Sequence, residues 1–214
     1  MLELFYKQFV NPGDLVFDIG ANVGSHSRAF LNLGARVVAV EPDPRCISEL
    51  QSIPRLSVVH AAAGEDGVFG QLKFGHSSVA STLSGKWIES ATRVDRFGGF
   101  EWTAELPVIQ VSLDHLIQMY GRPDFIKIDV EGYEAEVLRG LSSPVKALSF
   151  EFHPEFSDSI LDCLEQLSGL GFHKFSYSLG ESFTLTPWQS AMGVYNDIPG
   201  YRGGKTYGDI YARL

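Results

Sequence analysis

A glycine-rich turn follows the first strand-like run of the chain, and its residue types suit a ligand site. Residues 15–17 are apolar, Asp18 ends the run, and Gly20, Asn22 and Gly24 follow with the spacing Asp-x-Gly-x-Asn-x-Gly. Glycine allows backbone conformations and close approaches that a side chain would block. In an open α/β sheet, ligands bind outside the carboxyl ends of the strands, commonly at the first such turn. The turn is therefore the first candidate site.

The chemistry of this turn favours a cationic ligand over a phosphate. Its spacing differs from the G-x-G-x-x-G of dinucleotide-binding enzymes. A carboxylate at Asp18 would repel a pyrophosphate, whereas it can hold a cationic amine. Glu41 ends the next apolar run, residues 35–40, and an acid at such a strand end can accept hydrogen bonds from both ribose hydroxyls. S-adenosylmethionine combines an amino-acid part with a ribose and carries no phosphate.

These side chains meet only if strands and helices alternate along the chain. An amphipathic helix beginning at Ser25 separates the first two apolar runs, which makes a right-handed βαβ unit. We expect further strands at residues 56–60, 108–111, 125–128, 147–152, 172–177 and 208–214, and helices at 44–51, 113–120, 129–138 and 160–167. No helical pattern clearly separates the last two strands, so an antiparallel pair at the edge of a mostly parallel sheet is expected.

Length and composition limit the class of protein. At 214 residues the chain has the size of one domain, and we expect a single domain over residues 1–214. The formal net charge of −9 and the lack of a Lys/Arg cluster disfavour a nucleic-acid partner. Cys46 and Cys163 form no CxxC pair, which favours a reducing, cytoplasmic setting. Residues 1–13 lack the apolar stretch of a signal peptide or membrane span and predict a short helix that caps the sheet.

Several sequence blocks resemble one known family. The chain is similar to the FkbM-type methyltransferases, within the large group of seven-stranded, Rossmann-like enzymes that use S-adenosylmethionine. The resemblance rests on VFDIGANVG at 16–24, VEP at 40–42, SLD at 112–114, FIKIDVEGYE at 125–134 and GDIY at 208–211. The block at 125–134 is the most specific of these. The resemblance implies a three-layer α/β fold and a methyl transfer reaction.

The resemblance also implies cofactor-binding residues. Asp18, Gly20, Asn22 and Gly24 would line the methionine end of S-adenosylmethionine, and Glu41 would hold its ribose. Each has a simpler alternative, since the glycines could only shape the turn, Asp18 could cap a helix, and Glu41 could be a solvated acid.

The adenine end is implied at the segment after the third strand. Ala62, Ala63 and Gly64 would face the adenine, and Glu65 or Asp66 could bind its amino group. No single acid stands out at this position.

Three side chains at strand ends are candidates for a general base. Methyl transfer to an alcohol requires alignment of the nucleophile and removal of its proton, and a positioned base contributes about 10²–10⁴-fold. Asp129, Glu131 and His153 are the candidates, and His153 has the most suitable unperturbed pKa. Alternatively, His153 binds a loop carbonyl and Glu131 caps a helix. Lys127 lies in mid-strand, where we expect it to pair with an acid across the sheet.

The same three residues could hold a divalent metal ion, because carboxylates and imidazole suit such ions. Their spacing along the chain is unspecific, so we expect no metal site.

The strand–helix alternation stops between residues 68 and 107. A long connection inside a compact domain is often a functional lid, and the alternative is an added hairpin. Trp87, Phe97, Phe100 and Trp102 lie in this segment. These aromatic side chains could stack on an acceptor, or they could form a small core that holds the segment down.

The sequence therefore favours an S-adenosylmethionine-dependent enzyme that methylates a hydroxyl of a small molecule or saccharide. A protein that keeps the nucleotide cleft without turnover is the first alternative. A nicotinamide-dependent oxidoreductase is a weaker one, because the G-x-G-x-x-G spacing is absent.

Overall fold

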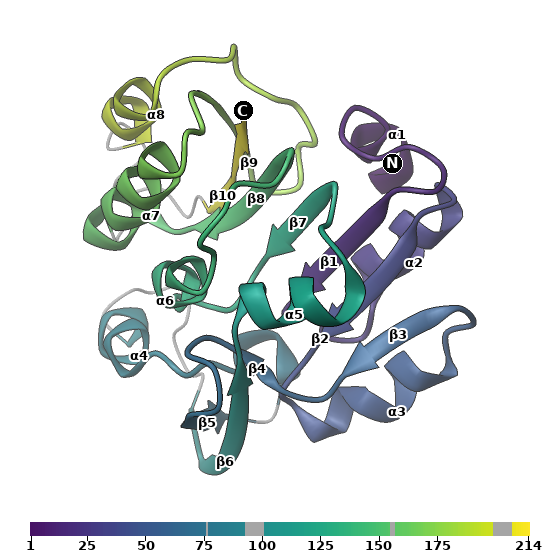
Figure 1. The fold of residues 1–214 in the computed structure, drawn as a ribbon. Helices are drawn as coiled ribbons and strands as arrows, with labels where there is room; N and C mark the ends of the chain where they lie inside the picture. The colour runs from purple at the N-terminus through teal and green to yellow at the C-terminus, as the bar shows by residue number, and fades with distance from the viewer. Residues whose placement is uncertain (76, 93–100, 155–156, 199–206) are drawn as a thin grey trace.

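The computed structural model describes the whole chain except residues 76, 93–100, 155–156 and 199–206 (Figure 1). Its helices are α1 (Leu2–Tyr6), α2 (Ser25–Asn32), α3 (Pro44–Ser52), the 3-10 turn η1 (Ser78–Ala80), α4 (Gly85–Ala91), α5 (Leu113–Tyr120), α6 (Glu134–Arg139), α7 (Ser157–Gly169) and α8 (Ala191–Asp197). Its strands are β1 (Leu15–Ile19), β2 (Arg36–Val40), β3 (Leu56–Val59), β4 (Ala62–Ala63), β5 (Phe69–Phe74), β6 (Ala104–Val111), β7 (Phe125–Ile128), β8 (Ala147–Phe152), β9 (Lys174–Leu179) and β10 (Gly208–Arg213).

Seven strands form one sheet in the order β3-β2-β1-β7-β8-β10-β9. The strands from β3 to β8 are parallel to their neighbours, whereas β10 runs antiparallel to both β8 and β9. The expected α/β sheet with an antiparallel carboxyl-terminal strand is therefore confirmed, and β9 forms its edge. The expectation that no helix separates the last two strands is wrong, because the short helix α8 lies between them.

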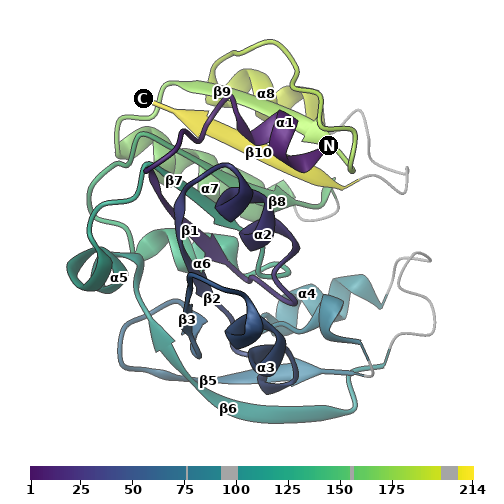
Figure 2. The same cartoon turned by 90° about the vertical axis from the view of Figure 1, so that its right-hand side faces the viewer.

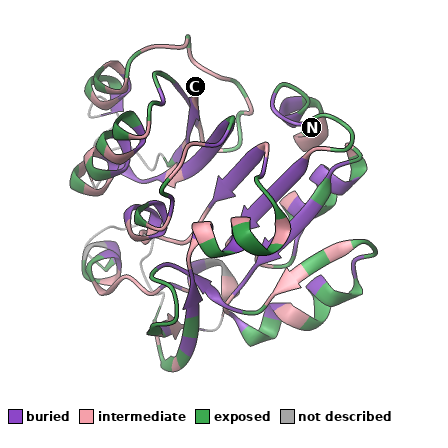
Figure 3. Cartoon of the chain, in the orientation of Figure 1, coloured by how far each residue is buried: buried purple, intermediate pink, exposed green. Residues whose placement is uncertain are grey.

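The sheet is covered on both faces, which explains the continuous apolar runs in its strands. All residues of β1 and β7 are buried. One face packs against α5, α6, α7 and α8, and the other packs against α1, α2 and α3 (Figures 1 and 2). Figure 3 shows the strands buried at the centre, with exposed residues on the outer sides of the helices. In the part of the chain that is described, no helix combines the length and apolarity needed to cross a bilayer.

The segment between residues 68 and 107 contains a hairpin. β5 and β6 pair antiparallel from Phe69↔Ile109 to Phe74↔Ala104, and β4 pairs parallel with β6. The strand β6 begins earlier than residue 108, where the sequence placed it, and α4 follows η1 within the segment. Figure 1 shows the hairpin and α4 gathered at the edge of the main sheet where β1 and β7 end.

The aromatic residues of this segment form a small core. Trp87 is 1% exposed and packs edge-to-face on Trp102, with ring centroids 5.5 Å apart. The Trp102 indole N–H donates to the carbonyl oxygen of Ala80 at 2.8 Å. For these two tryptophans the small-core alternative is the one observed, whereas Phe97 and Phe100 lie outside the described residues.

The loop after β7 is longer than the sequence indicated. The predicted helix at 129–138 begins only at Glu134, because Glu131 (φ 54°) and Gly132 (φ 82°) adopt left-handed backbone conformations. The Glu134 carboxylate accepts the backbone N–H groups of Val130 and Gly132, at 3.2 and 3.1 Å. Glu134 thus holds the loop that precedes α6. The helix cap considered for Glu131 is not formed, because the N-cap residue of α6 is Tyr133 and it has no side-chain cap hydrogen bond.

Candidate active site

The turn after β1 passes very close to the end of β7. A Cβ atom at Gly20, where φ is +78°, would lie 1.7 Å from the carbonyl oxygen of Asp129, so only glycine fits this position. Gly24 is also left-handed, and a Cβ there would lie 2.6 Å from the Cδ1 atom of Ile53. Gly20 therefore brings the two candidate loops together, whereas Gly24 packs the turn against the end of α3.

Asp18, near the end of β1, is buried and does not line the cavity described below. Its side chain is 1% exposed, and one carboxylate oxygen accepts the hydroxyl hydrogen of Ser27 in α2 at 2.6 Å. Burial raises the pKa of Asp18, while Lys127 opposes that rise. Asp18, which the sequence placed at the methionine end of the cofactor, is absent from that cavity lining, because its side chain is buried and bonded to Ser27. Asp18 instead ties the turn to α2.

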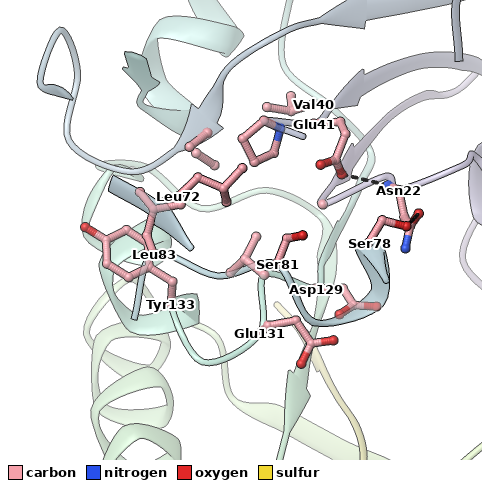
Figure 4. A pocket seen from close by; sticks show the side chains of 15 residues that line it. Asn22, Val40, Glu41, Leu72, Ser78, Ser81, Leu83, Asp129, Glu131 and Tyr133 are labelled. Atoms are coloured by element: carbon pink, nitrogen blue, oxygen red, sulfur yellow. Dashed lines mark hydrogen bonds between the residues drawn. The ribbon is translucent and has the colours of Figure 1, made fainter. Parts of the chain in front are cut away.

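A cavity opens at the carboxyl edge of the sheet, between the turn after β1, the loop after β7 and the 68–107 segment (Figure 4). It encloses about 680 Å³, including its open mouth. Its lining includes Gly20, Asn22, Val40, Glu41, Pro42, Ala62, Ala63, Leu72, Ser78, Ser81, Leu83, Asp129, Val130, Glu131 and Tyr133. Seven of these residues were candidates from the sequence, namely Gly20, Asn22, Glu41, Ala62, Ala63, Asp129 and Glu131.

Glu41 is held at one side of the cavity by two backbone donors. Its carboxylate oxygens accept the N–H groups of Asn22 and Asp43, both at 2.8 Å. Each oxygen keeps a further lone pair, because a carboxylate can accept about four hydrogen bonds. Burial raises the pKa of Glu41 to about 7, although the two N–H donors oppose that rise. The carboxylate is thus positioned to accept two more hydrogen bonds, and its charge changes near neutral pH.

The other side of the cavity near Leu72, Leu83 and Tyr133 is apolar (Figure 4). Ala62 and Ala63 of β4 also line the cavity. These side chains offer a flat ligand group a surface without a competing charge.

Glu65 and Asp66, which the sequence offered as partners for an adenine amino group, are absent from the cavity lining. The Asp66 carboxylate pairs with the imidazole of His115 and accepts the backbone N–H of Ser112. This expectation is therefore corrected, because Asp66 binds the start of α5 and Glu65 is exposed.

Side chains of the 68–107 segment connect it to the loops of the cavity. Ser78 donates to the side-chain oxygen of Asn22 at 3.0 Å, and Ser81 donates to Asp43 at 2.9 Å. The Thr82 hydroxyl donates to the carbonyl oxygen of Glu131 at 2.7 Å. Ser78 and Ser81 line the cavity and were not among the residues predicted from the sequence. The segment thus forms one wall of the site.

Lys127 and Asp129 form an ion pair at the end of β7. The Lys127 ammonium is 2.7 Å from a carboxylate oxygen of Asp129, and the two side chains are 2% and 32% exposed. Burial opposes ionisation of Asp129, but the ammonium outweighs burial and lowers the pKa of the carboxyl. Lys127 pairs with an acid as expected, but the partner Asp129 directly follows the end of its own strand and does not lie across the sheet. Asp129 therefore faces the cavity as a fixed carboxylate.

His153 meets two carboxylates beside this pair. Its Nε2 atom lies 3.1 Å from Glu151 and 3.8 Å from Glu131. Glu131 lines the cavity. His153 and Glu151 do not line it and instead border a separate small void. Burial and neighbouring carboxylates raise the pKa values of Glu131 and Glu151 well above their usual range. Glu151 was missed, although its position two residues before His153 places both side chains on one side of an extended chain.

Comparison with known proteins identifies similar sequences. The family described as "Methyltransferase FkbM domain" matches residues 18–174. Hexuronic acid methyltransferase AglP of Haloferax volcanii is 25% identical over 64% of this chain and 54% of its own length. The 2-O-methyltransferase NoeI of Sinorhizobium fredii is 26% identical over 70% of this chain and 66% of its own length. The chain thus spans about half to two thirds of these relatives.

Solved structures share the fold at low sequence identity. A precorrin-6y C5,15-methyltransferase of Geobacter metallireducens aligns with a TM-score of 0.51 and 13% identity, covering 99% of this chain and 85% of that one. A TehB-like SAM-dependent methyltransferase of Corynebacterium glutamicum aligns with a TM-score of 0.50 and 12% identity, covering 100% and 87%. At this identity the likeness concerns the fold alone.

Proposed function

The chain belongs to the FkbM methyltransferase family, and on that premise we propose that it transfers a methyl group from S-adenosylmethionine to a hydroxyl of a small molecule or sugar. The main support for this proposal is the cavity. Its lining has Glu41 on one side, Asp129 and Glu131 on another side, and an apolar end (Figure 4). The names of the two relatives, one acting on a hexuronic acid and the other a 2-O-methyltransferase, favour a saccharide hydroxyl.

The residues present fit S-adenosylmethionine better than a phosphate-bearing nucleotide. Glu41 has one free lone pair on each oxygen for the two ribose hydroxyls. Ala63 and its apolar neighbours would take the adenine. The acidic end at Asp129 would attract the cationic sulfonium and ammonium groups, whereas a phosphate would be repelled there. Gly20 lets the two loops beside the proposed methionine part approach each other, and we assign Asp18 and Gly24 to shaping the turn.

The protein would contribute alignment and a proton acceptor. S-adenosylmethionine supplies an electrophilic methyl group, so that the acceptor oxygen bonds to carbon while the S–C electron pair stays on sulfur. Asp129 is the carboxylate at the cavity that we assign to orient the hydroxyl and take its proton. Lys127 fixes this carboxylate in one place. The 68–107 segment, as a proposed lid, would keep water away from the reacting atoms.

The proposal is tested by calorimetric titration of the purified protein with three ligands. We expect binding of S-adenosylmethionine and of S-adenosylhomocysteine, and no binding of NAD, because the acidic cavity repels a pyrophosphate. Tight NAD binding without either sulfur ligand would refute the proposal. A screen for transfer of a labelled methyl group to alcohols and saccharides then identifies the acceptor.

Glu41→Gln should weaken S-adenosylmethionine binding about 10–100-fold at pH 8, because hydrogen bonds to a charged group contribute about 1.5–3 kcal/mol. With a pKa of about 7, the ionised fraction of Glu41 rises as the pH is raised from 6 to 8. The ratio of variant to wild-type Kd should therefore rise about tenfold over this range. The ratio of the two Kd values removes the effect of the cofactor's own ionisation, because that effect is the same for both proteins.

The matched control for this variant is Glu49→Gln, the same change at an exposed acid of α3, which should bind like wild type. A Kd ratio near one at both pH values for Glu41→Gln would remove Glu41 from the site.

A further inference from the structure

We propose that Glu131, Glu151 and His153 form a binding site for a divalent metal ion beside the cavity. Glu131 follows β7, and Glu151 and His153 lie at the end of the neighbouring parallel strand β8. The pairing Ile128↔Phe150 places the end of β7 beside the last residues of β8, so the three side chains converge although they are distant in sequence. They present two carboxylates and one imidazole, a donor set that suits divalent metal ions.

The distances between the three side chains match those of a metal site. The His153 Nε2 atom is 3.1 Å from Glu151 and 3.8 Å from Glu131, and all three donor atoms lie within 4.8 Å of one another. Ligand atoms at about 2.1 Å from a divalent ion are about 3.0 Å apart when adjacent and about 4.2 Å apart when opposite. The donors therefore need only small side-chain rotations to share one ion.

The two carboxylates lack a strong cationic partner in the described part of the chain. The side chains of Glu131, Glu151 and His153 are only 19%, 12% and 8% exposed. Among the described residues, no lysine or arginine forms an ion pair with Glu131 or Glu151, and the nearby Lys127 ammonium contacts Asp129. Buried carboxylates are stabilised when they are paired or coordinate a metal ion. A divalent cation would supply the missing positive charge.

The cluster lies between two cavities. A small void of about 10 Å³, close to the volume of a single water-sized sphere, borders Glu151 and His153 together with apolar side chains such as Phe150 and Ile160. On the other side Glu131 lines the larger cavity, next to Asp129. An ion at the cluster would thus keep open coordination positions toward the cavity.

The role of the ion rests on the proposed methyl transfer, whereas the binding site does not. A bound metal ion lowers the pKa of a coordinated hydroxyl. The acceptor hydroxyl would bind the ion at an open position, and its proton would pass to Asp129. The cation would also hold the acceptor oxygen in place for attack.

The experiment is a Mn²⁺ titration of the full chain after dialysis against a chelator, followed by electron paramagnetic resonance of the free ion. We expect one saturable site in the wild-type protein. Glu151→Gln and Glu131→Gln should each weaken Mn²⁺ binding at least tenfold, since even loss of an outer-shell partner costs about 10–100-fold. Glu165→Gln, an exposed acid on α7, is the matched control and should bind Mn²⁺ like wild type.

Two outcomes would overturn the metal site. One is the absence of saturable Mn²⁺ binding up to about 1 mM, and the other is unchanged affinity in both variants. Thermal melting without metal and binding of S-adenosylmethionine are measured on the same samples. If the wild-type protein binds S-adenosylmethionine but not Mn²⁺, only the metal site is contradicted. If the wild-type protein does not bind S-adenosylmethionine, the proposed function is contradicted.

Discussion

Asp129→Asn should lower kcat by about 10²–10⁴-fold, the contribution of a positioned general base. Asp129 has the geometry for this role, because it lines the cavity and its carboxylate is fixed 2.7 Å from the Lys127 ammonium. Asparagine has nearly the same shape and can orient a hydroxyl, but it cannot take the proton. The measurement is kcat for the acceptor found in the methyl-transfer screen, at saturating cofactor.

The Kd for S-adenosylhomocysteine should change much less than kcat in Asp129→Asn, because the ribose and adenine contacts remain. Asp197→Asn makes the same chemical change on α8, away from the cavity lining, and serves as the control. A kcat within twofold of wild type for Asp129→Asn would exclude Asp129 as the base and direct attention to Glu131. If the Kd for S-adenosylhomocysteine instead rises as much as kcat falls in Asp129→Asn, Asp129 contributes to cofactor binding.

Lys127→Met should lower the free energy of unfolding by about 3–5 kcal/mol, the usual cost of removing one partner of a buried ion pair. Lys127 is 2% exposed, and besides Asp129 it lies within the electrostatic range of Asp18 and Asp209. Methionine has a similar length, so loss of packing is small. The carboxylates that remain would repel one another without the ammonium. Urea-induced unfolding of both proteins at pH 7 measures the difference.

Lys174→Met, at an exposed position of the edge strand β9, controls for the loss of a lysine and should change stability by less than about 0.5 kcal/mol. In the double variant Lys127→Met/Asp129→Asn part of the stability should return, because the unpaired charge is gone. A loss below about 1 kcal/mol in Lys127→Met would show that the pair contributes little to folding.

Much of the fold follows from local sequence patterns. The buried strands β1, β7 and β8 are mostly apolar runs, and Asp129 and His153 directly follow β7 and β8 as polar breaks. The strand–helix–strand pattern of residues 15–40 indicated the βαβ unit in which β1 and β2 pair in parallel. Short elements were harder to predict, because α8 has too few residues for a clear periodic pattern and β6 extends through Pro107.

The candidate site was predictable where residues lie at strand ends. Glu41, Asp129 and Glu131 could be assigned to one edge, since parallel strands place their carboxyl ends together. Side-chain direction could not be assigned this way. Asp18 is one residue before the strand end and is buried, whereas Glu131 lines the cavity from a loop position with a left-handed backbone.

The sequence by itself therefore determined the class of fold, the edge of the sheet that holds the site, and the turn that begins it. Only the tertiary structure decided that Ser78 and Ser81 form a wall of the cavity and that Glu151 joins Glu131 and His153. The physical reason is that periodicity and strand ends depend on neighbouring residues, whereas these contacts depend on how separate elements dock. Docking is set by packing and by left-handed backbone at positions such as Gly20 and Glu131, which no local pattern specifies.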